Sequence, residues 1–165
     1  MNRTLSILFA MMLAIAGSAY AQTDTSATTA GDGLYPNGTT FNGVPVSGLD
    51  IGTGALINGT NGVAEGHVAI ALFGPTNIIT NQQQIIKIEA DFTGGSRAAA
   101  NVVTLNGTAT VDMGDGTLPL TGVPIVVTLT FDGVEGGSVG LSIGAASLPT
   151  SALTDGTMDV SDIPD

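Results

Sequence analysis

Residues 84–92, QIIKIEADF, carry the clearest structural signal in the sequence. Apolar and charged side chains alternate along this stretch with a period of two. The apolar set is Ile86, Ile88, Ala90 and Phe92, and the charged set is Lys87, Glu89 and Asp91. Because successive side chains of a β-strand point to opposite faces of a sheet, this pattern predicts a strand with one buried and one solvated face.

A second stretch, residues 123–131 (VPIVVTLTF), alternates in the same way. Proline lacks an N–H donor, so Pro124 is expected at the start of this strand or on an edge. Weaker strand signals surround these two stretches. They cover residues 44–51, 67–73, 101–113, 139–143 and 157–160.

Residues 101–113 permit two interpretations: one bent strand, or two strands that turn at Asn106-Gly107. The apolar residues of this stretch keep the same parity on both sides of Gly107. They are Val103, Leu105, Ala109, Val111 and Met113. This continuity favours one strand, with its hairpin turn later, at residues 114–116.

Turn-forming dipeptides recur between the strand signals. Asn-Gly or Asp-Gly occurs at residues 37–38, 42–43, 58–59, 61–62, 106–107, 115–116, 132–133 and 155–156. Such pairs supply the positive φ angles of tight hairpins. After the first 21 residues no stretch has convincing helical periodicity. We therefore expect an all-β fold, a single antiparallel β-sandwich of jelly-roll or immunoglobulin-like type with seven to nine short strands.

The start of the chain has the pattern of a cleavable signal peptide, predicted over residues 1–21. Arg3 provides a positive charge, and residues 5–16 (LSILFAMMLAIA) form an apolar run that is too short to span a bilayer as a helix. Residues 19–21 (AYA) then place small side chains where a signal peptidase cuts. We predict cleavage before Gln22 and a secreted or periplasmic protein.

The segment that follows the predicted cleavage site has an unusual composition. Residues 22–33 (QTDTSATTAGDG) contain no large apolar side chain, so burial is not expected to offset the entropy of ordering them. We predict a flexible N-terminal segment there and place the β-sandwich domain at residues 34–165.

The charge balance limits the possible partners. Without the leader, Lys87 and Arg97 stand against 14 acidic residues. Such a surface repels nucleic-acid phosphates and anionic membranes, so we expect no nucleic acid and no membrane insertion. The expected partners are other protein chains or further copies of this one, joined through an exposed strand edge.

The sequence offers little for catalysis. It contains no cysteine and one histidine, His67, and it lacks the G-x-S-x-G pattern of a nucleophile elbow. We name no catalytic residue and expect His67 to lie on the surface or at a strand edge. Stacking platforms for sugars are also scarce, because the chain has no tryptophan and Tyr35 is the one tyrosine after the leader.

Calcium is the one cofactor that the acidic loops suggest, since hard cations take oxygen ligands from loop carboxylates. The candidate ligands are Asp112, Asp115, Asp132 and Glu135. Neither of the two loops that contain them, residues 112–116 and 132–136, matches the sequence pattern of a calcium-binding loop with its distal glutamate. Asp-Gly also forms a hairpin turn without any bound ion.

Two functional hypotheses follow. The first is a secreted or surface β-domain without enzymatic activity, with a structural or interaction role in a matrix, an appendage or the cell envelope. The second is a calcium-dependent glycan-binding module, or a secreted hydrolase that uses the loop carboxylates. The absence of a concentrated catalytic motif favours the first.

Overall fold

The computed structural model describes residues 23–79, 81–133 and 136–163, so the predicted signal peptide lies outside the described residues. The described part of the chain is built from antiparallel strands and contains no helix. The strands are β1 (Asp24–Leu34), β2 (Thr40–Phe41), β3 (Val44–Pro45), β4 (Gly48–Ile57), β5 (Val63–Asn77), β6 (Gln82–Ala99), β7 (Val102–Asp112), β8 (Leu120–Phe131), β9 (Gly137–Ile143), β10 (Ala146–Ser147) and β11 (Ser151–Ile163).

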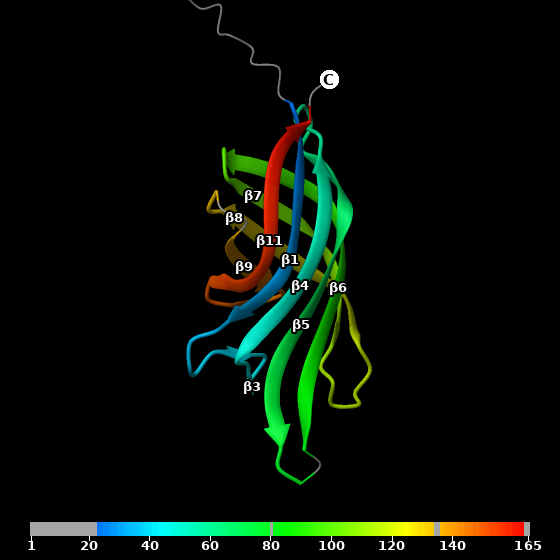
Figure 1. Cartoon of the computed structure of the whole chain (residues 1–165). Helices are drawn as coiled ribbons and strands as arrows, with labels where there is room; N and C mark the ends of the chain where they lie inside the picture. Colours follow the sequence, from blue (N-terminus) through cyan, green and yellow to red (C-terminus); the bar gives the residue numbers. More distant parts are fainter. Residues whose placement is uncertain (1–22, 80, 134–135, 164–165) are drawn as a thin grey trace, which may run out of the picture.

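Nine of these strands form one sheet in the order β10-β9-β11-β1-β4-β5-β6-β7-β8. Strand β8 also pairs with β9, so the pairings form a closed ring, while β2 and β3 make a separate small hairpin. In Figure 1, β11, β1 and β4 run in front of β7, β8 and β9. The predicted all-β antiparallel architecture is confirmed, with more strands than the expected seven to nine in the described residues, and with longer ones.

The two strands with the clearest alternation occur as predicted. In β6, Ile86 and Ile88 are fully buried, and in β8, Val127 and Leu129 are fully buried. Pro124 is aligned with Thr108 of β7, and it lies inside β8, one residue before the β8–β9 register begins at Ile125. Its carbonyl accepts a hydrogen bond from the backbone N–H of Gly144 at 2.8 Å, so the expected position at the start of the strand or on a free edge is wrong. The alternating apolar faces meet in one core between the front and back strands.

Strand β7 is continuous through Gly107, as the parity of its apolar residues predicted. The neighbouring strand β6 has an irregular register between Phe92 and Gly94, and its backbone approaches Gly107 closely. A Cβ atom at Gly107 would lie 2.0 Å from the carbonyl oxygen of Asp91. The absence of a side chain therefore permits the two strands to remain paired at this irregularity.

The predicted flexible segment over residues 22–33 is wrong for residues 24–33, which form most of β1. Strand β1 lies inside the sheet, between β11 and β4. Thr25, Ala27 and Thr29 are buried, and small side chains suffice there because both edges of the strand are paired. Backbone hydrogen bonding on two sides, rather than large apolar side chains, orders this segment.

The β5–β6 hairpin extends beyond its neighbours. Strand β4 pairs with β5 only as far as Phe73, and β7 pairs with β6 only from Lys87 onward. Residues 74–79 and 81–84 therefore project from the end of the sheet, as the lower part of Figure 1 shows. Among the described residues, no helix is long and apolar enough to cross a membrane.

Candidate functional site

Three connections between strands lie at one end of the molecule, which we call the hairpin end. They are residues 35–47 between β1 and β4, residues 74–84 of the projecting hairpin, and residues 113–119 between β7 and β8. The strand register brings their bases onto neighbouring strands, from β1 through β4, β5 and β6 to β7. Figure 1 shows them at the end opposite the C-terminus.

The tip of the projecting hairpin is shaped by Asn77. Its side-chain oxygen accepts a hydrogen bond from the backbone N–H of Ile79 at 2.9 Å, and its carbonyl accepts one from Asn81 at 2.8 Å. Asn81 adopts a positive φ of 53°, which asparagine tolerates better than most residues. This turn leaves both isoleucines of the tip outside the core.

Large apolar side chains are exposed at the hairpin end. Ile78 is 97% exposed and Ile79 is 95% exposed, and Leu118 in the neighbouring connection is 90% exposed. Burying one such aliphatic side chain is worth about 1.5–3 kcal/mol. These residues were not predicted from the sequence, although two consecutive isoleucines between Asn77 and Asn81 were the signal that could have indicated them.

The hairpin end is nearly free of charge. Of the 14 acidic residues of the chain, Asp115 is the one that falls in the three connections, and none of the lysines or arginines does. The side chain of Gln84 joins two of the connections by donating a hydrogen bond to the carbonyl of Met113 at 2.7 Å. This end therefore differs from the acidic remainder of the molecule.

A recess lies at the base of the hairpin, and we call it the Tyr35 pocket. Its volume is about 190 Å³, and its lining includes Tyr35, Pro36, Pro45, Val46 and Pro75. The Tyr35 hydroxyl is buried and has no hydrogen-bond partner among the described residues. Burial raises the pKa of this phenol well above its usual value, so Tyr35 is neutral at physiological pH.

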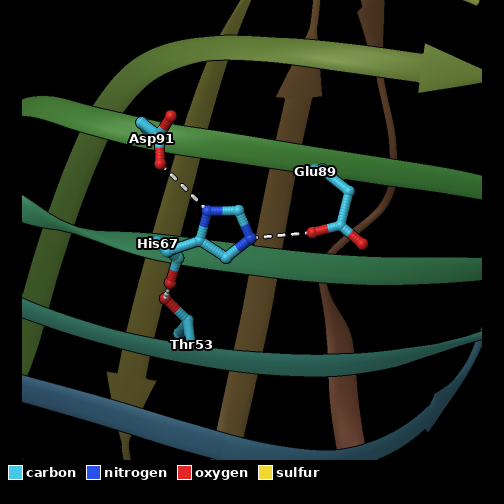
Figure 2. A network of polar contacts seen from close by, with 4 residues as sticks. All are labelled: Thr53, His67, Glu89 and Asp91. Atoms are coloured by element: carbon cyan, nitrogen blue, oxygen red, sulfur yellow. Dashed lines mark hydrogen bonds and ion pairs between the residues drawn. The ribbon is translucent and has the colours of Figure 1, made fainter.

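The single histidine lies on the outer face of the sheet, between two carboxylates (Figure 2). His67 Nδ1 is 3.0 Å from Asp91 Oδ1, and Nε2 is 2.7 Å from Glu89 Oε2. The Thr53 hydroxyl donates a hydrogen bond to the carbonyl of His67 at 2.7 Å. His67 is exposed on an internal strand, which confirms the surface location, while the strand-edge alternative is wrong.

This arrangement suits a structural ion pair better than a catalytic base. Both ring nitrogens face carboxylates, and only the doubly protonated imidazolium donates to both. The hydrogen bonds to Asp91 first, and then to Glu89, raise the pKa of His67 above its ordinary value of 6.5. The nearby Thr53 hydroxyl is directed at a backbone carbonyl, so it is not activated as a nucleophile.

The His67 pair predicts a small pH-dependent stabilisation. Because the pKa of His67 is raised on folding, its contribution is complete below pH 6.5 and is lost as the pH rises through the pKa of the folded state. We expect His67→Gln to lower the free energy of unfolding more at pH 5.5 than at pH 8.5. The difference should stay below about 1 kcal/mol, because the groups are exposed and screened.

Urea denaturation at the two pH values measures this difference. As a control, Glu89→Gln/Asp91→Gln should abolish the pH-dependent part of the His67→Gln effect. An effect of His67→Gln that is equal at both pH values would show that the ion pair contributes nothing.

The structure separates the predicted calcium ligands that it describes, Asp112, Asp115 and Asp132. Asp112 and Asp115 lie in or beside the β7–β8 connection, whereas Asp132 follows β8 at the opposite end of the same strand pair. Glu135 lies outside the described residues. One ion therefore cannot be held by both loops, and the described residues contain no group of three acidic, histidine or cysteine side chains arranged for a metal ion.

The carboxylates of the β7–β8 connection bind their own turn. Asp112 accepts a hydrogen bond from the backbone N–H of Gly114 at 2.9 Å. Asp115 accepts from the hydroxyl and the N–H of Thr117 at 2.6 and 2.9 Å, and these bonds lower the pKa of Asp115. These contacts are those of a tight turn, and calcium binding stays a prediction.

A second recess, of about 510 Å³, lies at the opposite end of the molecule from the hairpin. Its walls are mainly polar and include Asn58, Thr60 and Arg97. Arg97 is ion-paired with Asp162 and also donates to the carbonyl of Ala100. The guanidinium therefore joins β6 to β11 and has an internal role.

The hairpin end thus combines exposed apolar side chains, low charge and a recess, whereas His67 and Arg97 are engaged in ion pairs within the chain. Comparisons of the chain with protein-family models, with curated protein sequences and with solved structures found no match.

Proposed function

We propose that this protein is a secreted or surface β-domain without enzymatic activity, and that it has a structural or interaction role exerted through its hairpin end. The observation that carries the proposal is the full exposure of Ile78 and Ile79 at the tip of a projecting hairpin. Exposed apolar side chains that cluster on a projecting element mark interaction surfaces in soluble proteins.

The charge distribution also favours the hairpin end as the interaction surface. Acidic side chains keep the remaining surface soluble and oppose close association. The three connections of the hairpin end contain Asp115 as their sole acidic residue, so a partner meets little electrostatic cost there. The amide and hydroxyl groups that flank the tip, such as those of Thr76 and Gln83, are suited to the polar rim of an interface.

The cellular location in this proposal is inferred from the signal-peptide pattern of the amino-terminal sequence. The mature protein would begin at Gln22 and act in the periplasm, on the cell surface or in an extracellular matrix. An exported domain of this kind contributes by holding chains together. It needs a rigid body and an exposed contact surface, and it needs no group of activated catalytic side chains.

The proposal predicts the size at which the protein is found in the cells that produce it. We expect the exported protein to occur in an assembly larger than the monomer, and Ile78→Asp/Ile79→Asp to shift most of it to the size of a monomer. Size-exclusion fractionation of extracts from these cells, followed by immunodetection, measures the shift. His67→Gln should remain assembled, because the proposal gives His67 no contact role.

Two results would contradict the proposal. One is an assembly larger than the monomer that the hairpin variant leaves unchanged. The other is turnover of a substrate by the purified protein that depends on His67 or on Asp112.

A further inference from the structure

The hairpin end carries an apolar projection, the tip of the β5–β6 hairpin, and a recess between the base of that hairpin and residues 35–47. We propose that it binds the hairpin end of a second copy of this chain, with one isoleucine of each tip, Ile78 or Ile79, seated in the Tyr35 pocket of the other copy. This inference rests on the proposed function, because it names the partner of the same surface.

The recess is large enough for the projection. The Tyr35 pocket has a volume of about 190 Å³, and three prolines, a valine and a tyrosine line it together with the polar side chains of Asn37, Thr39 and Ser47. An apolar cavity of about 150 Å³ accepts a benzene-sized group. One isoleucine side chain of the tip therefore fits the pocket in size, and the proline and valine side chains offer it apolar contacts.

The hairpin tip and the Tyr35 pocket are placed so that the tip-in-pocket contact can form twice in a dimer, once in each direction. Pro75 lines the pocket at the base of the hairpin, and Ile78 and Ile79 form the tip of the same hairpin. When two such hairpins lie antiparallel about a two-fold axis, the tip of each one lies beside the base of the other. A two-fold dimer uses the same patch on both copies, and this arrangement satisfies that requirement.

Strand pairing between the two copies is limited by the sequence of the hairpin. The register of β5 and β6 shifts between Phe73 and Thr76, and Pro75 lacks an N–H donor. A bulge and a proline are devices that prevent edge-to-edge extension of a sheet. Side chains seated in pockets therefore hold the dimer, and the contact closes instead of growing into a fibre.

Charge favours a second copy over a lipid surface. Two copies repel each other because both are strongly acidic, and this repulsion is weakest where Asp115 is the single acidic residue of the three connections. The same connections contain no lysine, arginine or tryptophan, the side chains that commonly anchor an apolar tip at a membrane. The hairpin end thus has the features of a protein interface.

Sedimentation equilibrium of the purified mature protein tests the proposal. We expect a concentration-dependent dimer, and we expect Ile78→Asp/Ile79→Asp to raise its dissociation constant by about a hundredfold or more. The matched control is Leu56→Asp/Val63→Asp, which changes two exposed apolar residues at the opposite end of the sheet. This control should leave the dissociation constant unchanged, and circular dichroism verifies that each variant is folded.

A complementation experiment tests the tip-in-pocket contact itself. Asn37 is exposed and lines the Tyr35 pocket, so Asn37→Trp is expected to block the pocket and prevent self-association. A mixture of Asn37→Trp with Ile78→Asp/Ile79→Asp retains one intact tip and one open pocket. We expect this mixture to form a heterodimer, weaker than the wild-type dimer, although neither variant dimerises alone.

Several results would overturn the proposal. They are a wild-type protein that is monomeric at all concentrations, a dimer that the tip variant leaves unchanged, and a mixture that shows no complementation. A monomer that sediments with phosphatidylcholine vesicles through Ile78 and Ile79 would identify a lipid surface as the partner. That result would overturn the dimer while leaving the interaction role of the hairpin end in place.

Discussion

A chain that begins at Leu34 is expected not to fold. Removing residues 24–33 takes away most of β1, which is aligned with β4 over ten residue pairs and with β11 over ten more. Each backbone hydrogen bond of such ladders contributes about 0.5–1.5 kcal/mol, and the whole domain is stable by about 5–15 kcal/mol. The loss of both ladders, and of the buried Ala27, is therefore comparable with the total stability.

The expected observation is the absence of a cooperative thermal transition and of the β-sheet circular dichroism spectrum. The control is a chain that begins at Thr23, which should melt like a chain that begins at Gln22 because both residues precede β1. If the chain that begins at Leu34 melted at the same temperature as this control, the segment would be dispensable, as its composition alone suggests.

Gly107→Ala is expected to destabilise the protein by about 3 kcal/mol or more. The added Cβ would lie 2.0 Å from the carbonyl oxygen of Asp91 and 3.0 Å from the Cα of Phe92. Both contacts involve backbone atoms of β6, so the clash cannot be relieved by a side-chain rotation. Overpacking of this kind commonly costs 1–3 kcal/mol, and a displaced strand costs more.

The matched control for this substitution is Gly52→Ala. Gly52 is exposed on β4, and a Cβ there would meet no atom within 4 Å. Alanine is favoured over glycine inside a strand, so we expect no loss and a gain of up to about 1 kcal/mol. Thermal and urea denaturation of both variants measure the contrast, and equal stabilities would contradict the close approach of β6 and β7.

The sequence predicted the parts of the fold that depend on apolar alternation. The strand around Ile86 and Ile88 and the strand around Val127 and Leu129 were clear, because each has one buried and one exposed face. Strand β1 was not predicted, because it is ordered by pairing on both sides and its buried residues are small. The length of the β5–β6 hairpin was also not predicted, since the strand signals ended at Phe73 and resumed at Gln84, whereas β5 extends to Asn77 and β6 begins at Gln82.

The candidate site depended on information that a single sequence lacks. The sequence directed attention to acidic loops, and the structure shows Asp112 and Asp115 engaged in their own turns. The features that distinguish the hairpin end arise from separate segments brought together by strand register. The exposure of Ile78 and Ile79 is also needed to identify the surface. Two consecutive isoleucines are normally expected in a core, and the structure instead places them at the tip of a hairpin.

The position of β1 has a consequence for the order of folding. Its two neighbours are β4, which follows it closely in the chain, and β11, the last strand of the described residues. Asp24 is aligned with Ile163, so the chain must have been synthesised as far as Ile163 before this pairing is complete. Contacts between such distant segments slow folding, so the nascent chain remains without its complete sheet until β11 has been made.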